Sequence, residues 1–373
     1  MTLTLDFQLQ EKFNLNMDLE KLRNKIDSLD SKIIDCLNKR VELAIEIGRI
    51  KEKLGKDVYD PTRESEILNK MDSKNKGPLE NDAIRSIYRE IISSTIRLEK
   101  QITIAYLGPE ATFTHEAALK SFGNSLDYIA LNTFSDIFSS VEKGEAQYGV
   151  IAVENSTEGS VTHSLDLLVE TDLKIISEIY LDISLCLISQ SSLADIKTVY
   201  SKDIAIDQCR RWLSRKLPGI EEIHTSSTAE AVFQIKDKPR TAAIGSATAA
   251  RIYKIPIIEK NIQDKMENVT RFLIIGNSPS GRLGGGRDKT SFVFSLQDKP
   301  GALQYALDPF CKRGINLSKI ESRPNKRKLW DCYFFVDIIG HYEDLKVQEA
   351  LKELKATCPM VKWLGSYPKS KKS

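Results

Sequence analysis

The chain has 373 residues, of which 41% are hydrophobic and 28% are charged, as is typical of a soluble globular protein. Its 54 basic and 52 acidic residues nearly cancel, so the composition gives no indication of nucleic-acid binding. No segment is long and apolar enough to span a bilayer, and the N-terminus lacks the features of a signal peptide. We therefore expect a cytoplasmic protein of two or three domains with neither a membrane nor a nucleic-acid partner.

Residues 17–101 are predicted to be helical throughout. Apolar residues recur every three or four positions from Leu19 to Leu54, which predicts one long helix. Asp60 suits the N-cap of a second, shorter helix, with Pro61 at its first position, and a third helix follows residues 77–82. So long a helix cannot bury its apolar stripe against two shorter ones. We therefore expect it to pair with a second copy of the chain.

Several polar residues on these helices occupy unusual positions. Arg40 and Lys51 are eleven residues apart, about three turns, so they face the same way, whereas Arg23 lies about 100° around the helix. Thr95 continues the apolar stripe of the third helix, and Glu99 lies one turn beyond it. The simpler interpretation is solvated charge on a helical bundle. The alternative is that several cations converge inside a helical dimer, where they would suit a small polyanion.

Three stretches of this segment, LRNKIDSLDSKIIDCLNKRVELAIEIGRIK, VYDPTRE and IYREIISSTIRLE, resemble the all-helical chorismate mutases. Those enzymes are intertwined dimers that convert chorismate to prephenate. The reaction is a unimolecular rearrangement that needs no nucleophile and no cofactor. It needs a compactly held dicarboxylate and positive charge at the breaking ether oxygen.

The resemblance assigns a role to Glu99 in particular. Some family members have Gln at this position, donating to the ether oxygen, and a carboxylate can donate only when protonated. We therefore predict that Glu99 has a raised pKa, or that mutase activity falls as pH rises. The resemblance places these further residues at the mutase site: Arg40 and Arg63 on the substrate carboxylates, Lys51 on the ether oxygen, Arg23 from the partner, Asp60 and Glu64 on the substrate hydroxyl, and Thr95 nearby.

Residues 102–277 change to short β-rich runs separated by amphipathic helical stretches. The predicted strands are ITIAYLG, YGVIAV, LKIISEIYL, SLCLIS, TAAIG and TRFLIIG, and their alternation with helices indicates an α/β fold with a mainly parallel sheet. Ligands of such sheets bind at the carboxyl ends of strands, where the polar loop VENSTEGSV follows YGVIAV. An ordinary strand-to-helix connection with Ser/Thr caps would also explain this loop.

Six motifs in this segment resemble prephenate dehydratase: AYLGPEATFTHEAA, VENSTEGSVTHSLDLL, VYSKDIAIDQCRRWL, SSTAEA, AAIGSATAA and NVTRF. The resemblance implies a two-lobed fold like that of the periplasmic binding proteins, with substrate in the cleft. Prephenate loses carbon dioxide and its ring hydroxyl together, so neutral donors and a hydroxyl suffice for the reaction. The implied site residues are Asn155, Ser201, Gln208 and Thr270, with Arg271 as carboxylate partner, Phe272 against the ring, and Thr112, Ser156, Glu158 and Thr228 as lining.

The segment departs from the family pattern in several places. Ala111 stands where Gly is usual, and Leu185 stands where His is common. Asp182 replaces a Pro, and the pair Asp203–Ile204 replaces Pro-Gln. These departures bear on the local loop shape and on any role of that His.

Residues 278–289, SPSGRLGGGRDK, are predicted to be a linker. Residues 290–367 are predicted in the order β-α-β-β-α-β, an α+β ferredoxin-like unit with a kink at Pro309. A Pro-Gly helix start and a surface turn would be the simpler interpretation of the two motifs in this unit.

These two motifs, DKPGALQYAL and NLSKIESRPNKRKLWDCYFFVD, resemble the ACT-type regulatory domain of bifunctional chorismate mutase/prephenate dehydratases. The resemblance implies a phenylalanine site at a dimer interface. Its residues would be Gly301 at a close backbone approach, Ala302 and Leu303 as amide donors to the carboxylate, Glu321 on the amino group, and Ser322, Arg323 and Pro324 shaping a turn.

Together the resemblances imply a bifunctional, cofactor-free and metal-free enzyme of phenylalanine biosynthesis, with chorismate and prephenate as substrates and phenylalanine as inhibitor. It would be a homodimer or a higher homo-oligomer. One alternative is a chain with a single working site, limited by Glu99 or Leu185. Another is a non-catalytic amino-acid-binding regulator. That alternative leaves four basic residues of the helical segment unexplained, namely Arg23, Arg40, Lys51 and Arg63. The sequence also contains no basic helix-turn-helix candidate through which such a regulator could bind DNA.

Overall fold

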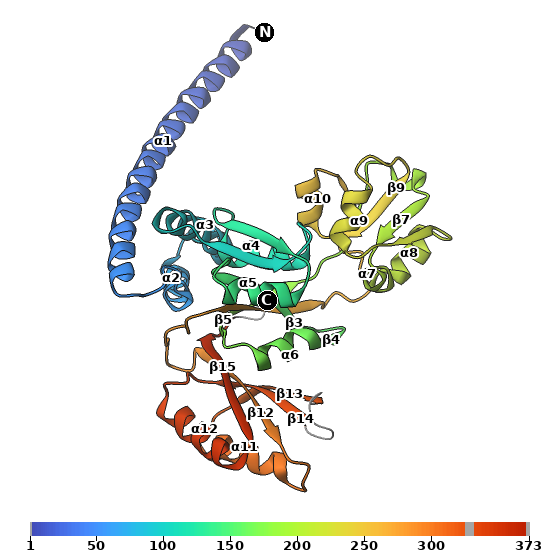
Figure 1. The fold of residues 1–373 in the computed structure, drawn as a ribbon. Helices are drawn as coiled ribbons and strands as arrows, with labels where there is room; N and C mark the ends of the chain where they lie inside the picture. The colour runs from blue at the N-terminus through green and yellow to red at the C-terminus, as the bar shows by residue number, and fades with distance from the viewer. Residues whose placement is uncertain (1, 325–331, 371–373) are drawn as a thin grey trace. The chain divides into compact units, whose positions relative to one another are not determined.

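A computed structural model of the chain describes residues 2–324 and 332–370, with side chains from residue 15 onward (Figure 1). The chain forms two compact units. One comprises the chain up to Val58 together with Ser94–Lys100, and the other comprises Tyr59–Ser93 and the chain from Gln101 onward. Helix α3 (Asn81–Glu99) therefore contributes its first turns to the second unit and its last turns to the first.

Helix α1 (Thr2–Lys53) dominates the first unit. It begins well before the expected start at residue 17, because no Pro or Gly interrupts the chain from Thr2 until Gly48. The apolar stripe predicted from the sequence is exposed along it, including Leu22, Ile26 and Leu29. Within the described residues, no helix combines the length and apolar character needed to cross a membrane.

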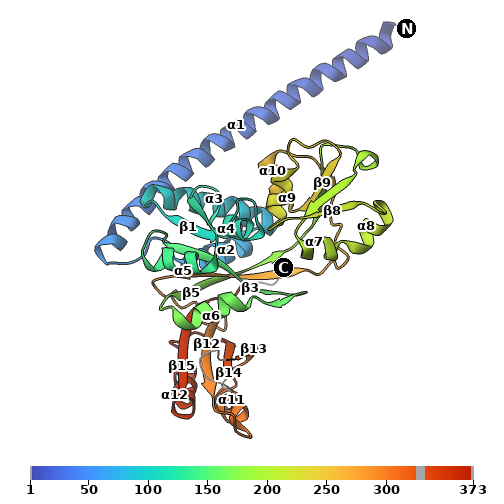
Figure 2. The ribbon, with the colours of Figure 1, turned by 45° about the vertical axis from the view of Figure 1, so that its right-hand side comes forward.

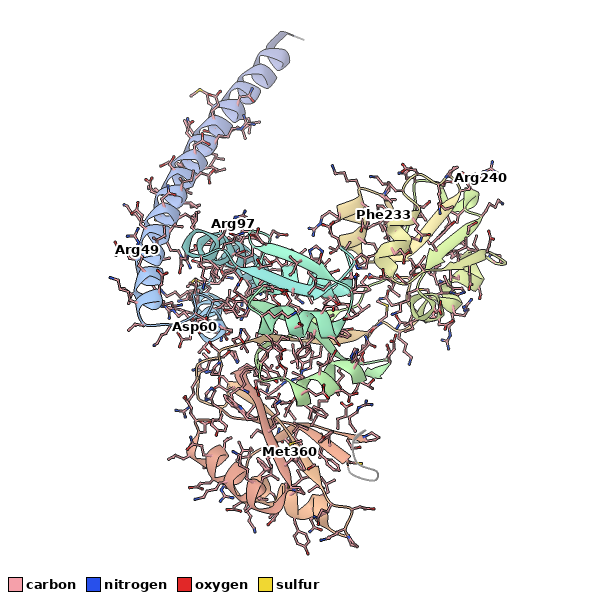
Figure 3. All side chains as sticks on the ribbon, viewed as in Figure 1. Arg49, Asp60, Arg97, Phe233, Arg240 and Met360 are labelled. Carbon is pink, nitrogen blue, oxygen red and sulfur yellow. The ribbon has the colours of Figure 1, made fainter. Side chains whose placement is uncertain are left out.

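The second unit begins with helix α2 (Pro61–Lys74). Asp60 lies at the start of this helix (Figure 3). Its carboxylate accepts a hydrogen bond of 3.0 Å from the Arg63 backbone N–H, which confirms the predicted N-cap. The first sheet has the order β2-β1-β3-β11-β5, with β4 paired to β3. Its strands are β1 (Thr103–Leu107), β2 (Asp127–Leu131), β3 (Tyr148–Asn155), β4 (Gly159–Ser160), β5 (Lys174–Asp182) and β11 (Val269–Gly276).

A second sheet lies between β5 and β11 in the chain and has the order β10-β6-β9-β7-β8. Its strands are β6 (Cys186–Ile188), β7 (Thr198–Ser201), β8 (Glu221–His224), β9 (Thr241–Gly245) and β10 (Ile257–Glu259). The chain thus leaves the first sheet, builds the second and returns, which gives two lobes (Figure 2). The helices are α4 (Phe113–Phe122), α5 (Phe134–Glu142) and α6 (Thr162–Glu170) in the first lobe, and η1 (Leu193–Asp195), α7 (Asp203–Gln208), α8 (Arg210–Lys216), α9 (Thr228–Gln234) and α10 (Ala247–Tyr253) in the second.

Most strands of each sheet run in the same direction, as expected, but both sheets are mixed because β11 and β6 run against both of their neighbours. Strands β1, β2 and β3 are parallel, but β11 runs antiparallel to both β3 and β5. In the second sheet, β6 runs antiparallel to β9 and β10, whereas β7 is parallel to its neighbours β8 and β9. The reason is the passage of the chain between lobes: β11 re-enters the first sheet beside β5, in the opposite direction.

The C-terminal part has the predicted element order. Strands β12 (Asp288–Leu296), β13 (Leu317–Pro324), β14 (Cys332–Ile339) and β15 (Met360–Pro368) alternate with helices α11 (Ala302–Lys312) and α12 (Leu345–Thr357). The antiparallel sheet has the order β13-β14-β12-β15. Residues 325–331 of the quoted regulatory motif lie outside the described residues. One core cluster joins this sheet to the first lobe, since Leu364 and Tyr367 pack with Ile175 and Leu273.

Candidate active sites

A polar cluster forms where β3 and β11 lie side by side. Asn155 and Thr270 are directly paired across the two strands, and the Asn155 amide donates 2.8 Å hydrogen bonds to the Thr270 hydroxyl oxygen and to the Asn268 side-chain oxygen. The Asn155 side-chain oxygen accepts from the backbone N–H groups of Thr157 and Glu158, at 2.9 and 3.1 Å. The loop VENSTEGSV therefore closes on itself as an Asx-type turn that fixes Asn155.

The second lobe adds Gln208, at the end of α7, to this cluster. Its amide donates to the Glu158 carboxylate at 2.8 Å, and its side-chain oxygen accepts from Asn268 at 3.1 Å. The structure thus brings together four of the predicted residues, Asn155, Glu158, Gln208 and Thr270, from both lobes. Sequence reasoning missed Asn268, which is buried and bonded to both amides. Its position two residues before Thr270, on the same face of the strand, was the available signal.

The cluster is suited to orientation and proton donation. Amides can orient a carboxylate, and a hydroxyl can donate a proton or hydrogen bond to a leaving group. The Thr270 oxygen accepts from Asn155, so its own O–H proton remains available for donation. Ser156 lies at the edge of the cluster and ties the loop to β11, since its hydroxyl oxygen accepts from the Val269 N–H at 2.9 Å.

Four other predicted residues of this site lie outside the cluster. Ser201 is fully buried and donates to the Ile244 carbonyl at 2.8 Å. Thr112 caps α4, accepting from the His115 N–H at 3.3 Å, and Thr228 is the first residue of α9. Phe272 is only 1% exposed, so it presents no surface to a substrate ring in this arrangement.

The structure corrects the expectation that Arg271 binds a substrate carboxylate. Successive residues of a strand point to opposite faces, so Arg271 faces away from Thr270. Its guanidinium is buried against Glu178 at 2.8 Å, Asp337 at 2.6 Å and the Tyr367 hydroxyl at 2.9 Å. These partners occupy all three guanidinium nitrogens.

Two of the departures from the family pattern, at Leu185 and Ala111, also lie in the interior. Leu185 is 1% exposed within the core of the second lobe, so the position that commonly carries His is a packing position here. Ala111 has a φ of 68°, in the left-handed region that favours glycine, and is fully buried. The backbone therefore keeps at Ala111 the conformation that the usual Gly would adopt freely.

Four predicted mutase residues meet within the first unit. The Arg40 guanidinium donates to the Thr95 hydroxyl at 3.0 Å, and Lys51 donates to the Val58 carbonyl at 2.8 Å. Burial raises the pKa of Glu99, and the nearby charges of Lys51 and Arg40 oppose that shift only in part. The predicted upward direction of the Glu99 pKa is thus confirmed.

Gly48 makes room for Glu99 in this group. A Cβ atom at Gly48 would lie 2.8 Å from the Glu99 Oε2 atom. A glycine inside a helix costs about 1 kcal/mol relative to alanine, so the presence of Gly48 within α1 has a steric reason here.

The remaining predicted mutase residues are less closely grouped. Arg23 is exposed on α1, and Arg63 is exposed on α2, where it pairs with Glu66 at 2.9 Å. Burial raises the pKa of Glu64 to about 7, while Arg89, 4.0 Å away, and a hydrogen bond from Tyr59 favour its ionised form.

The predicted regulatory residues lie on α11 and β13. Gly301 caps α11 with a φ of 79°, directly before Ala302 and Leu303. The Glu321 carboxylate lies 3.0 Å from the Lys319 ammonium. The expectation that residues 322–324 shape a turn is wrong, because Ser322, Arg323 and Pro324 belong to strand β13 and pair with Phe334, Tyr333 and Cys332 of β14.

Comparisons with known proteins match two successive parts of the chain. A family model described as chorismate mutase type II matches residues 22–100, and one described as prephenate dehydratase matches residues 104–280. A bifunctional chorismate mutase/prephenate dehydratase from Aquifex aeolicus is 47% identical over 358 residues, covering 95% of this chain and 98% of the relative.

Two solved structures share the fold of most of the chain. A prephenate dehydratase from Arthrobacter aurescens in complex with L-Phe has a TM-score of 0.67 and 34% identity, covering 73% of this chain and 92% of that one. A structure described as GqqA, a novel type of quorum quenching acylase, has a TM-score of 0.66 and 27% identity, covering 72% of this chain and 98% of that one.

Proposed function

The chain belongs to the bifunctional chorismate mutase/prephenate dehydratase family, and on that premise we propose how its residues carry out the two reactions. The enzyme rearranges chorismate to prephenate and then decarboxylates and dehydrates prephenate to phenylpyruvate, in the biosynthesis of phenylalanine. The observation that supports both assignments best is the grouping of the charges: cations surround Glu99 in the helical unit, whereas amides and a hydroxyl form the cluster in the α/β unit.

In the mutase site, Arg40 and Arg63 bind the substrate carboxylates, and Lys51 stabilises the negative charge that develops on the ether oxygen. Glu99 donates a second hydrogen bond to that oxygen when it is protonated, and burial favours this form by raising its pKa. The remaining members of the site are Arg23 from the partner, Asp60, Glu64 and Thr95. No group of the protein forms a covalent bond during the rearrangement, so its contribution is orientation and electrostatic stabilisation.

In the dehydratase site, the amides of Asn155 and Gln208 orient prephenate so that its leaving carboxylate lies out of the ring plane. The electron pair of the breaking C–CO2 bond enters the ring as the C–OH bond breaks on the far side. Thr270 donates to the departing hydroxyl, which leaves as water once a proton has been transferred. Ser156 and Glu158 hold the loop that carries Asn155, and we assign Thr112 and Thr228, at the starts of α4 and α9, to the lining of the cleft.

The C-terminal residues 290–367 form an ACT-type regulatory domain that binds phenylalanine through the Gly301–Leu303 helix start and Glu321. We assign residues 17–101 to the mutase domain, 102–277 to the dehydratase domain and 278–289 to the linker. The exposed apolar stripe of α1 supports a homodimer or higher oligomer, because it leaves Leu22, Ile26 and Leu29 uncovered. The proposed compartment is the cytoplasm.

Amide hydrolysis, the activity named for the acylase relative, is less well supported by this cluster. An acylase needs a nucleophile activated by a base, and the described members of the cluster are amides, hydroxyls and one carboxylate. The Ser201 hydroxyl donates to a backbone carbonyl instead.

Two variants test the assignment of the two sites. Arg40→Ala should abolish chorismate consumption while leaving conversion of added prephenate to phenylpyruvate unchanged. Thr270→Val should abolish conversion of prephenate to phenylpyruvate while leaving chorismate consumption unchanged, because valine keeps the shape of the side chain and removes the hydroxyl donor. Loss of both activities in either variant, with the fold intact by circular dichroism, would contradict the separation of the two sites.

A further inference from the structure

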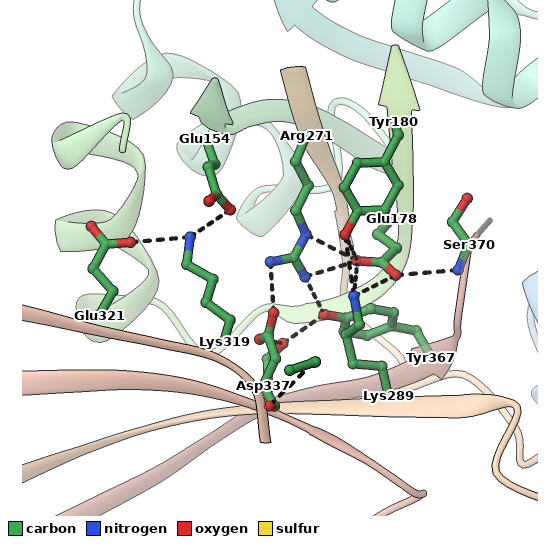
Figure 4. A network of polar contacts seen from close by, with 12 residues as sticks. Glu154, Glu178, Tyr180, Arg271, Lys289, Lys319, Glu321, Asp337, Tyr367 and Ser370 are labelled. Atoms are coloured by element: carbon green, nitrogen blue, oxygen red, sulfur yellow. Dashed lines mark hydrogen bonds and ion pairs between the residues drawn. The ribbon is translucent and has the colours of Figure 1, made fainter. Parts of the chain in front are cut away.

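The two strands that carry Asn155 and Thr270 also carry a charged residue each on their opposite face. Arg271 and Glu154 are directly paired across β11 and β3, one residue away from Thr270 and Asn155. Because side chains alternate along a strand, the polar cluster and this charged pair lie on opposite faces of the same two strands. Figure 4 shows that the charged face is turned toward the C-terminal sheet.

Arg271 is held from the C-terminal domain on one side and from β5 on the other. Asp337 of β14 and Tyr367 of β15 bind it at 2.6 and 2.9 Å, and Glu178 binds it at 2.8 Å. Lys289 of β12 lies 2.6 Å from the same Glu178 carboxylate (Figure 4). Burial alone would raise the pKa of Asp337, but Arg271 and Lys289 hold that pKa below its ordinary value. Arg271 and Lys289 therefore favour the charged form of the Asp337 carboxylate, and removing Arg271 would leave that buried charge without its partner.

Glu154 is held by a lysine that it shares with the regulatory motif. The Lys319 ammonium of β13 lies 2.8 Å from the Glu154 carboxylate and 3.0 Å from the Glu321 carboxylate. The Lys319 and Glu321 side chains are each 16% exposed and the Glu154 side chain is 41% exposed, so water screens the Glu154–Lys319 pair more than the Glu321–Lys319 pair. One ammonium between two carboxylates leaves a net charge of minus one, which favours a second cation beside Glu321.

Close packing prevents the C-terminal sheet from moving independently of the first lobe. A Cβ atom at Gly365 of β15 would lie 2.1 Å from the Ile175 carbonyl oxygen of β5, so these two backbones touch. Val293, Leu364 and Tyr367 share one core with Ile175 and Leu273. A shift of the C-terminal sheet must therefore displace the strands below it or break this contact.

We propose that Glu154 and Arg271 are positioning residues through which the C-terminal domain sets the geometry of Asn155 and Thr270. An amino acid whose ammonium binds Glu321 competes with Lys319 there, and Lys319 then binds Glu154 alone. The redistribution of this ion pair acts on β3 at the residue before Asn155. This inference rests on the proposed function, because it requires the dehydratase site at Asn155 and the amino-acid site at Glu321.

The first test compares two lysines that reach from the C-terminal sheet to the first lobe. Lys319 binds Glu154 on a strand of the cluster, whereas Lys362 of β15 donates to the Val169 carbonyl at 2.7 Å, on helix α6. The activity remaining at saturating phenylalanine should rise about fivefold or more in Lys319→Met and stay unchanged in Lys362→Met. Lys319→Arg, which keeps the charge, should restore much of the inhibition. Mutase activity serves as the control for folding.

Glu154→Gln separates coupling from binding, because Glu154 lies outside the regulatory domain. This variant should still bind phenylalanine by titration calorimetry and yet be inhibited less completely than the wild type. Its dehydratase kcat should change more than its KM, as expected when the geometry of the reacting groups changes rather than substrate affinity. A Glu154→Gln variant with wild-type kcat and wild-type inhibition would overturn the proposal.

The outcomes for the wild type distinguish this proposal from the one it rests on. A wild type without dehydratase activity, or without inhibition by phenylalanine, would contradict the proposed function itself. A wild type that is inhibited, with Lys319→Met and Lys362→Met responding equally, would leave that function standing and refute the role of the Glu154–Lys319 pair.

Discussion

Replacing Glu99 by glutamine should remove the pH dependence of the mutase reaction. The carboxyl of Glu99 is partly buried beside Arg40 and Lys51, and burial raises its pKa despite both cations. In the proposed mechanism only the protonated acid donates to the ether oxygen of chorismate. Glutamine carries a donor at every pH, so Glu99→Gln retains the interaction when the wild type has lost it.

The size of the effect follows from the titration of a single group. Above the pKa of Glu99, each further pH unit lowers the protonated fraction about tenfold, and kcat/KM for chorismate should fall in proportion. The profile of Glu99→Gln should be flat over the same range. At low pH the two enzymes should have similar activity, because both then present a donor.

The assay is the rate of chorismate consumption by wild type and variant between about pH 5 and about pH 9, a range that begins above the ordinary pKa of glutamate and ends below that of free lysine. Turnover of prephenate by the same samples reports whether the protein stays folded at each pH. A flat wild-type mutase profile would refute the requirement for a proton on Glu99. An equal decline in wild type and Glu99→Gln would assign the titration to another group.

Three further predictions concern packing and burial. Gly48→Ala should lower mutase activity, because the added Cβ atom would lie 2.8 Å from the Glu99 Oε2 atom. This loss is expected although alanine raises helix propensity by about 1 kcal/mol. An unchanged mutase rate in kinetic assays would contradict the prediction. Since the pKa of Glu64 is raised from 4.5 to about 7, the folded state binds this proton more tightly. The stability that Glu64 contributes is therefore fully present below pH 4.5 and is lost as pH rises through about 7. Glu64→Gln should remove this loss, up to about 3 kcal/mol in urea unfolding at pH 8, and equal stability of both proteins there would argue against a buried neutral Glu64. Gly365→Ala should weaken inhibition by phenylalanine in dehydratase assays while sparing the mutase, because its Cβ would lie 2.1 Å from the Ile175 carbonyl; wild-type inhibition would contradict the close contact.

Local patterns predicted the elements whose physical causes are local. The period of apolar residues in α1 and the Asp60 side chain as N-cap depend on neighbours within a few positions. Strand direction does not depend on such neighbours. Nothing in the residues of β11 shows that the chain has first built a second lobe, so the mixed sheet could not be predicted from them.

The error over Arg271 has a different cause, because the needed rule was available. Alternation along β11 places Arg271 on the face opposite Thr270. The two residues are neighbours in the short motif TRF, however, and the motif therefore assigns both to the substrate site. The same rule places Asn268 with Thr270, and the structure finds it bonded to Asn155. What the sequence could not provide is the partner on the far face, since Asp337 is more than sixty positions away in the chain.

The motif ESRP illustrates how a turn and a strand end can be confused. Pro324 suggested a turn, yet it is the last residue of β13, where a missing backbone N–H is tolerated. The residues before it, Glu321, Ser322 and Arg323, alternate between the two faces of β13. Glu321 and Arg323 therefore point toward the first lobe, where Arg323 pairs with Asp166. Glu321 pairs with Lys319 of the same strand.

The most direct measurement is a single incubation of the purified chain with chorismate, with and without phenylalanine, following prephenate and phenylpyruvate by chromatography. We expect prephenate to appear first, phenylpyruvate to follow, and phenylalanine to suppress the second product. Prephenate that accumulates without phenylpyruvate would contradict the dehydratase assignment. Chorismate that is not consumed, by a protein that still converts added prephenate, would contradict the mutase assignment.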